Sequence, residues 1–321
     1  MVPKWFLNSA FNQNLIPIFI WNMLYINIHI IVNPASGKEE PILSYLNTIF
    51  LNTGIHWEVS VTTPDREAFD IARSLIGKTE LIVIYGGDGS IAEVGRALYG
   101  CDTPMAIIPG GTANVMSKEL GIPQDAMEAI KLIAYGHTKV IAIDMAMAND
   151  TPFLLRVNLG IMADMIIQAD DALKHNYGQL AYGISAVQTL VHSEPKQYRL
   201  LIDGKEYIEE GVTLTVTNAG NIGISDFSFL PHINVTDGYL DVILMNNTDL
   251  LSLLRVAGTM LFQTESEVLK HWRCKAVTII LDKPTPYICD DTEQTASTIN
   301  ISMMPRVLKV LVAESYNKHA Q

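Results

Sequence analysis

The spacing of apolar and polar residues divides the chain into two parts near residue 150. In the first part, short apolar runs alternate with segments whose apolar residues recur every three or four positions, which predicts strands alternating with helices. The predicted strands are 25–32, 55–61, 81–85 and 105–108. The predicted helices are 39–51, 64–76, 90–98 and a further one after residue 112. Strand, glycine-containing turn and helix in repeated order are typical of a doubly wound α/β domain with a parallel sheet.

Strand-like segments dominate the second part of the chain. They are 153–158, 198–202, 212–217, 239–244, 275–281, 299–303 and 308–312. Asp203-Gly204 lies between two alternating arms and predicts a hairpin with a type I′ turn. Helices are predicted to be few, mainly at 179–191 and 250–264. We therefore expect an α/β domain over 25–148, a β-rich, sandwich-like domain over 149–303, and a cleft between them.

The first 24 residues are expected to form an N-terminal extension. Residues 16–32 are mostly apolar, but polar side chains interrupt them at Asn22, Asn27 and His29. The run is shorter than the roughly 20 apolar residues that a spanning helix needs, and no small-residue cleavage site follows it. An extension outside the membrane is the favoured interpretation, and an anchor at the membrane interface is the alternative.

Charge and cysteine content narrow the class of protein. Lys and Arg number 22 against 34 Asp and Glu, a net charge of −12, which disfavours nucleic acid as a partner. A mean hydropathy of +0.21 leaves room for an apolar substrate or a surface that faces a membrane. Cys101, Cys274 and Cys289 are too far apart for a disulfide framework or a metal clip, which indicates a reducing cytoplasm. The eight histidines form no closely spaced pair, so a zinc site is not expected.

Three glycine-containing turns follow the first, third and fourth predicted strands. They are 33–38 (Asn-Pro-Ala-Ser-Gly-Lys), 86–90 (Gly-Gly-Asp-Gly-Ser) and 110–114 (Gly-Gly-Thr-Ala-Asn). In a parallel sheet these turns share the carboxyl edge, where glycines and helix N-termini can bind phosphate. Lys38 adds a positive charge and Ser36, Ser90 and Thr112 add hydroxyl groups. Asp88 would repel phosphate unless a cation such as Mg²⁺ lay between them.

Two acidic segments in the second part carry weaker signals. Asp290, Asp291 and Glu293 form a carboxylate cluster that could accept a proton in phosphoryl transfer, but spacing alone favours a solvated acidic turn. The segment 237–241 (Asp-Gly-Tyr-Leu-Asp) fits a cation ligand and a plain hairpin turn equally well.

Several of these motifs together resemble the diacylglycerol kinase catalytic family, which includes bacterial lipid kinases, sphingosine kinases and ceramide kinases. They are Asn-Pro-Ala-Ser-Gly-Lys at 33–38, Gly-Gly-Asp-Gly-Ser-x-x-Glu at 86–93, Gly-Thr-Ala-Asn-Val at 111–115, Gln-Leu-Ala-Tyr at 179–182, Thr-Asn at 217–218, Asp-Gly-Tyr-Leu-Asp at 237–241 and the ending at 303–308. Gly-Gly-Asp-Gly by itself also occurs in NAD kinases and phosphofructokinases. The combination, in family order over nearly the whole chain, is much more specific.

The resemblance implies roles for individual residues. Those implied in ATP binding are Asn33, Pro34, Ala35, Ser36, Gly37, Lys38, Thr63, Gly86, Gly87, Asp88, Gly89, Ser90, Glu93, Gly111, Thr112 and Asn114. Those implied in binding Mg²⁺ are Asp88 and Asp144 in a water–magnesium network, and Asn234, Asp237 and the carbonyl of Tyr239 in a structural site. Asp291 and Glu293 match the segment that holds the base acting on the lipid hydroxyl. The last residues, about 304–321, are expected to return to the first domain.

Three residues depart from the family pattern. Thr292 replaces a glycine in the base segment, so a register that starts at Asp290 stays open. Val115 and Met162 replace an expected aspartate and an expected glycine. These departures motivate one alternative, a lipid- or nucleotide-binding sensor without catalysis. An NAD kinase-like enzyme is the other alternative, and the turn at 33–38 and the Ala92-Glu93 pair argue against it.

The sequence thus leads us to expect an ATP- and Mg²⁺-dependent lipid kinase that phosphorylates a hydroxyl of a lipid such as diacylglycerol. We expect a cytoplasmic protein that docks weakly and transiently at the inner membrane surface to reach its substrate. The net charge of −12 opposes binding to an anionic surface. The sequence does not decide whether the protein forms a homodimer.

Overall fold

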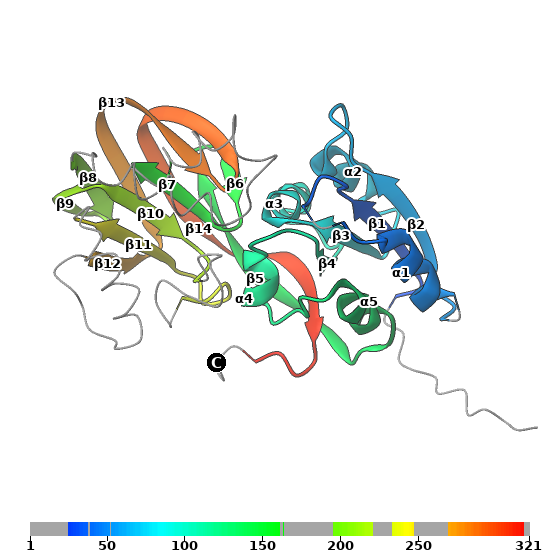
Figure 1. Ribbon diagram of the computed structural model, residues 1–321. Helices are drawn as coiled ribbons and strands as arrows, with labels where there is room; N and C mark the ends of the chain where they lie inside the picture. The colour runs from blue at the N-terminus through cyan, green and yellow to red at the C-terminus, as the bar shows by residue number, and fades with distance from the viewer. Residues whose placement is uncertain are drawn as a thin grey trace, which may run out of the picture.

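The computed structural model describes residues 25–37, 39–51, 53–160, 163, 195–220, 233–246 and 269–317 (Figure 1). Lys38, Met162, the N-terminal extension at 1–24 and the predicted helices at 179–191 and 250–264 lie outside the described residues. The motif at 179–182 lies outside them as well.

The first half is a doubly wound α/β unit, as the sequence predicts. Its parallel strands are β1 (Asn27–Val32), β2 (His56–Val61), β3 (Leu81–Gly86) and β4 (Met105–Pro109), in the spatial order β4-β3-β1-β2. Its helices are α1 (Ile42–Phe50), α2 (Ala68–Leu75), α3 (Asp88–Ala97), α4 (Val115–Glu119) and α5 (Ala126–Tyr135). Helix α2 packs against α3, α1 packs against α5, and the two pairs cover opposite faces of the sheet (Figure 1). All six residues of β3 are buried because this strand lies in the middle of the parallel sheet.

The second half is built from antiparallel strands. They are β5 (Thr138–Ala148), β6 (Thr151–Phe153), β7 (Arg156–Gly160), β8 (Lys196–Ile202), β9 (Lys205–Gly211), β10 (Thr213–Thr217), β11 (Leu240–Met245), β12 (Leu269–Cys274), β13 (Ala276–Cys289) and β14 (Thr292–Ala313). Strands β12, β11, β10, β7, β13 and β14 follow one another and then meet β4 of the first half. The predicted hairpin at Asp203-Gly204 is confirmed, since it joins β8 to β9 with φ of 45° and 83°.

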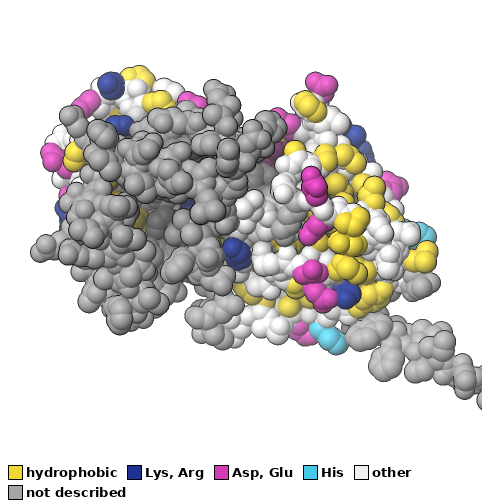
Figure 2. Space-filling view, in the orientation of Figure 1, with side chains coloured by type: hydrophobic (Ala, Val, Ile, Leu, Met, Phe, Trp, Pro, Cys, Tyr) yellow, Lys and Arg dark blue, Asp and Glu magenta, His cyan; other side chains and the backbone are white. Residues whose placement is uncertain are grey.

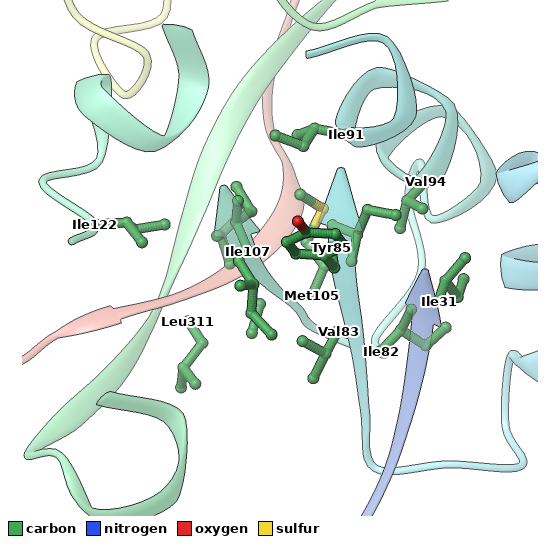
Figure 3. Close-up of a cluster of buried hydrophobic side chains, with 14 of the residues drawn as sticks. Ile31, Ile82, Val83, Tyr85, Ile91, Val94, Met105, Ile107, Ile122 and Leu311 are labelled. Carbon is green, nitrogen blue, oxygen red and sulfur yellow. The ribbon is translucent and has the colours of Figure 1, made fainter. Parts of the chain in front are cut away.

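Two hydrophobic cores correspond to the two halves, and β14 contributes to both. Its Ile299 and Ile301 lie in the core of the antiparallel half, whereas Leu308 and Leu311 lie in the core of the α/β half. Figure 3 shows Leu311 in the same cluster as side chains of the parallel strands. The strand also pairs with β5 along much of its length and touches β4 in parallel. The last strand of the chain therefore lies beside β4 and extends the first sheet.

Several predicted elements differ from the structure. The strands predicted at 299–303 and 308–312 are parts of one strand, β14. The helix predicted at 64–76 begins only at Ala68, because Thr63 and Arg66 exchange backbone hydrogen bonds of 3.1 and 3.0 Å and close a turn first. The strand predicted at 153–158 is two strands, β6 and β7. The chain bends between them because the carboxylate of Asp290 accepts hydrogen bonds from three consecutive amides, those of residues 154–156.

Strands β5 and β12 were not predicted. Strand β5 passes from one core to the other, so its burial does not alternate regularly along the strand. The helices among the described residues have ten residues or fewer, and none has the length and apolar character to cross a membrane. On the face shown in Figure 2, acidic side chains interrupt the apolar ones over the α/β half.

Candidate active site

The three glycine-containing turns meet at the carboxyl edge of the parallel sheet. Asn33, just after β1, donates its backbone N–H to the carbonyl of Tyr85 in β3 at 2.9 Å and its side-chain amide to Ser90 Oγ at 2.7 Å. The amide of Gly110, just after β4, donates to the carbonyl of Gly86 at 2.9 Å. Parallel strands end at the same edge, so turns that are distant in sequence become direct neighbours.

Glycine is required where the second and third turns cross. A Cβ added at Gly111 would lie 2.6 Å from the Cα of Gly87, closer than real Cβ contacts come. The amide of Gly111 donates to Asn114 Oδ1 at 2.9 Å, and Asn114 adopts a positive φ of 51°. A Cβ at Gly37 would lie 3.7 Å from Thr112 Oγ1, so the first turn also reaches this point. Backbone N–H groups and hydroxyls therefore collect at one place, as phosphate binding requires.

Asp88 stands at the first position of α3, inside this group of turns. Its Oδ1 accepts a hydrogen bond of 3.2 Å from the amide of Met116 in α4. Burial raises the pKa of Asp88, while the amides of Val115 and Met116 and the charge of Arg156 oppose that rise. A cation beside this carboxylate would compensate its lost hydration, so the residue fits a Mg²⁺ ion carried by phosphates.

The two adjacent aspartates of the β13–β14 turn have different surroundings. Asp290 is half-buried, and its carboxylate accepts hydrogen bonds of 2.8, 2.8 and 3.0 Å from the amides of Leu154, Leu155 and Arg156. Its own amide donates to the carbonyl of Arg156 at 2.8 Å. Burial raises the pKa of Asp290, and the three amides act against that rise. These four hydrogen bonds hold the β6–β7 bend, so Asp290 supports the fold.

Asp291 instead reaches the Gly-Gly-Asp-Gly turn of the other half. A Cβ added at Gly89 would overlap Asp291 Oδ2. Its Oδ1 lies 3.6 Å from Arg96 Nη1 and accepts a hydrogen bond of 3.3 Å from the hydroxyl of Thr292. The side chain of Asp291 is 44% exposed. A partly exposed carboxylate beside the Gly-Gly-Asp-Gly turn is placed to accept a proton there.

Glu93, Thr63 and Glu293 lie around this centre. Glu93 Oε2 accepts hydrogen bonds from the amides of Ala68 and Phe69 at 2.8 and 3.3 Å, so it caps α2 from α3. Burial raises the pKa of Glu93, and the negative charge of Asp291 adds to the effect. Thr63 lies at the carboxyl end of β2 and Glu293 is exposed at the start of β14. Glu293 pairs with Ile288 across the hairpin, beyond the turn that holds Asp291.

The acidic segment at 234–241 forms a separate cluster. Asp144 is fully buried, and its two oxygens accept hydrogen bonds of 2.7 Å each from the amides of Gly238 and Arg306. Asp237 Oδ2 accepts a hydrogen bond of 2.7 Å from Arg273, and its Oδ1 accepts one of 2.9 Å from the amide of Tyr239.

Asn234, another oxygen ligand expected in this cluster, is also engaged. Asn234 Oδ1 accepts hydrogen bonds from the amide and the hydroxyl of Thr236, at 3.0 and 2.9 Å. The guanidinium of Arg273 lies 4.2 Å from the centre of the Tyr239 ring. A structural Mg²⁺ at this place does not fit these donors as they are arranged, because Arg273 already provides the positive charge. Elsewhere in the described part of the chain, no three His, Cys, Asp or Glu side chains form a group suited to a metal ion.

Sequence reasoning missed two arginines of the site. Arg156 is 8% exposed and interacts electrostatically with Asp88 and Asp290. Arg96 contacts Asp291 from α3. Each is a lone cation in an otherwise apolar segment, at 94–98 and 154–157, and that signal could have identified both.

Known proteins resemble both halves of the chain. The family model described as the diacylglycerol kinase catalytic domain matches residues 27–146, and the YegS C-terminal NAD kinase beta sandwich-like domain matches residues 156–312. An uncharacterized protein of Synechocystis is 27% identical over 303 residues, which cover 88% of this chain and 69% of that protein. The diacylglycerol kinase of Bacillus subtilis is 28% identical over 234 residues, which cover 71% of this chain and 76% of that enzyme.

A solved structure shows the same fold. The crystal structure of a diacylglycerol kinase from Bacillus anthracis aligns with a TM-score of 0.72 at 24% identity, and the alignment covers 91% of this chain and 99% of that one. The two family models follow one another in the order of the two halves described above. The chain is a kinase whose first half matches the diacylglycerol kinase catalytic domain.

Proposed function

We propose that this kinase transfers the γ-phosphate of ATP to a hydroxyl group of a lipid such as diacylglycerol, with Mg²⁺ as cofactor. The observation that carries the proposal is the position of Asp291, which comes from the antiparallel half and lies against Gly89 in the phosphate-binding turn. Phosphoryl transfer to an alcohol needs a phosphate-binding edge and a proton acceptor. In this proposal the two halves of the chain supply one each.

The protein's own part in the reaction is alignment and charge compensation. The amides of the turns around Gly87 and Gly111 and the N-terminus of α3 would hold the phosphates, and Thr112 would add its hydroxyl. A Mg²⁺ ion bound with the phosphates at Asp88 would neutralise charge on the transferred group. Mg²⁺ in such sites takes one or two carboxylates together with the phosphates, so one aspartate at this edge suffices.

Asp291 would act on the lipid hydroxyl. Its Oδ2 accepts the hydroxyl proton as the oxygen forms a bond to the γ-phosphorus and the bond from that phosphorus to the β-phosphate oxygen breaks. ADP then leaves with the electron pair of the broken bond, and the phosphorylated lipid keeps the new ester bond. Because the carboxylate adjoins Gly89, acceptor and phosphate can meet without a large movement of either half.

The test is transfer of labelled phosphate from ATP into a lipid extract in neutral detergent micelles, with products separated by chromatography and identified by mass. We expect a labelled lipid with the unaltered protein and none with Asp88→Ala. Asp291→Asn should bind ATP normally and lose about 10²- to 10⁴-fold in rate, the usual contribution of a general base. Asp282→Asn, an exposed aspartate of β13, is the matched control and should react normally. Unchanged transfer by Asp88→Ala would contradict the phosphate site.

A second candidate acceptor is NAD. It is favoured by the match of residues 156–312 to a domain described as NAD kinase beta sandwich-like. The same labelled ATP with NAD in place of lipid separates the two acceptors, since each product has its own mass. Binding of ATP without transfer to either acceptor would point to a sensor that lacks catalysis.

A further inference from the structure

One face of helix α3 is directed at the β13–β14 turn. Gly89, Glu93 and Arg96 follow the spacing i, i+4 and i+7, so they share that face. All three meet the same partner: Asp291 leaves no room for a Cβ at Gly89, its charge raises the pKa of Glu93, and it forms an ion pair with Arg96. The helix that begins in the phosphate-binding turn therefore also carries the surroundings of the proposed base.

The two oxygens of Asp291 have different neighbours. Oδ1 lies 3.6 Å from Arg96 Nη1 and 3.3 Å from the hydroxyl of Thr292, whereas Oδ2 lies against Gly89. Arg96 and Thr292 thus hold one oxygen from opposite elements, α3 and β14. The other oxygen is directed to the place where the phosphates would bind.

The charges around Asp291 explain why a cation is needed there. Two further carboxylates lie near Asp291: Glu93 on α3, and Asp290, which precedes Asp291 in the turn. Cys289 ends β13, and burial raises the pKa of its thiol, so that group stays neutral. Within the described ranges, Arg96, with 17% of its side chain exposed, is the positive charge within ion-pair distance of Asp291. Partial burial strengthens this interaction relative to one in bulk water.

We propose that Arg96 is a positioning residue for the reaction: it holds the Asp291 carboxylate against Gly89 and offsets the negative charge of Glu93 and Asp290. The inference rests on the proposed function, in which Asp291 accepts the proton. It also gives Thr292 a role, because its hydroxyl supports the same oxygen where the family pattern has glycine.

The experiment compares Arg96→Gln and Arg96→Lys, each alone and combined with Asp291→Asn. We expect Arg96→Gln to lower kcat by about 10- to 100-fold, the usual loss when a reacting group is misplaced by about an ångström. KM for ATP should stay within twofold. Arg96→Lys should recover part of the rate because it restores the charge without the planar guanidinium.

Combination with Asp291→Asn separates positioning from general support of the fold. If Arg96 acts through Asp291, Arg96→Gln should cause no further loss in the Asp291→Asn protein. Arg73→Gln is the matched control, because Arg73 bonds the carbonyl of Ala97 at the end of α3 without touching Asp291. It should leave kcat unchanged.

Two results would overturn the inference. One is a kcat for Arg96→Gln within twofold of the unaltered protein, and the other is an equal further loss in the Asp291→Asn protein. Absence of transfer by the unaltered protein would instead overturn the proposed function, and this inference with it. Melting temperatures of all variants show whether a lost rate reflects an unfolded protein.

Discussion

Asp290 is the sole carboxylate partner of three consecutive backbone amides, which makes its replacement by alanine unusually informative. The substitution leaves the buried amides of residues 154–156 without their acceptor and removes a negative charge near Arg156. Each buried donor without a partner costs about 1–3 kcal/mol. With some water entering the turn, we expect Asp290→Ala to lower the free energy of unfolding by about 3–5 kcal/mol.

Urea denaturation followed by tryptophan fluorescence measures this loss. With a denaturant slope of about 3 kcal/mol per molar urea, the midpoint should fall by about 1–1.7 M. Asp291→Ala is the matched control, since it removes the neighbouring aspartate from a partly exposed position. It should change the free energy of unfolding by no more than about 0.5 kcal/mol, as surface substitutions usually do, while abolishing transfer.

The opposite pattern would refute this reasoning. If Asp290→Ala unfolded at the same urea concentration as the unaltered protein and lost its activity, Asp290 would be the base. The register of the base segment would then begin one residue earlier, as the sequence allowed.

Two further predictions concern stability. The melting temperature measured without nucleotide should respond neither to EDTA nor to millimolar Mg²⁺, because Arg273 holds Asp237. Arg273→Gln should melt at lower temperature and regain stability with Mg²⁺, and a drop in melting temperature of the unaltered protein with EDTA would contradict this. Burial in β1 lowers the pKa of His29 below 6.5, more than the nearby Glu58 raises it. The unfolded chain then binds more protons below pH 6.5, so this contribution to stability is complete above pH 6.5 and is lost as the pH falls through the folded pKa. His29→Gln should show a smaller drop in urea midpoint between pH 7.5 and 5.5, and an equal drop would refute the assignment.

Most of the secondary structure of the α/β half could be predicted from the sequence. Its apolar runs and helical periodicities are local properties, and the glycine turns after β1, β3 and β4 follow from them. The parallel order of the strands then places those turns at one edge. There the side-chain amide of Asn33 donates to Ser90 Oγ, and Gly111, whose amide donates to Asn114 Oδ1, packs against Gly87. Local reasoning failed at the start of α2, where the Thr63–Arg66 turn comes first and Glu93 of α3 then accepts the amide of Ala68, and at the bend between β6 and β7, which the distant Asp290 holds.

The sequence by itself determined the order of the elements, the three glycine-containing turns and the resemblance to a kinase family. Only the tertiary structure decided which of two adjacent aspartates supports the fold and which faces Gly89, because that depends on which amides and cations surround each one. It also brought Arg96 to Asp291 and Arg273 to Asp237. Such pairs are set by how helices and strands pack across the chain, and apolar periodicity carries no information about which distant charges will meet.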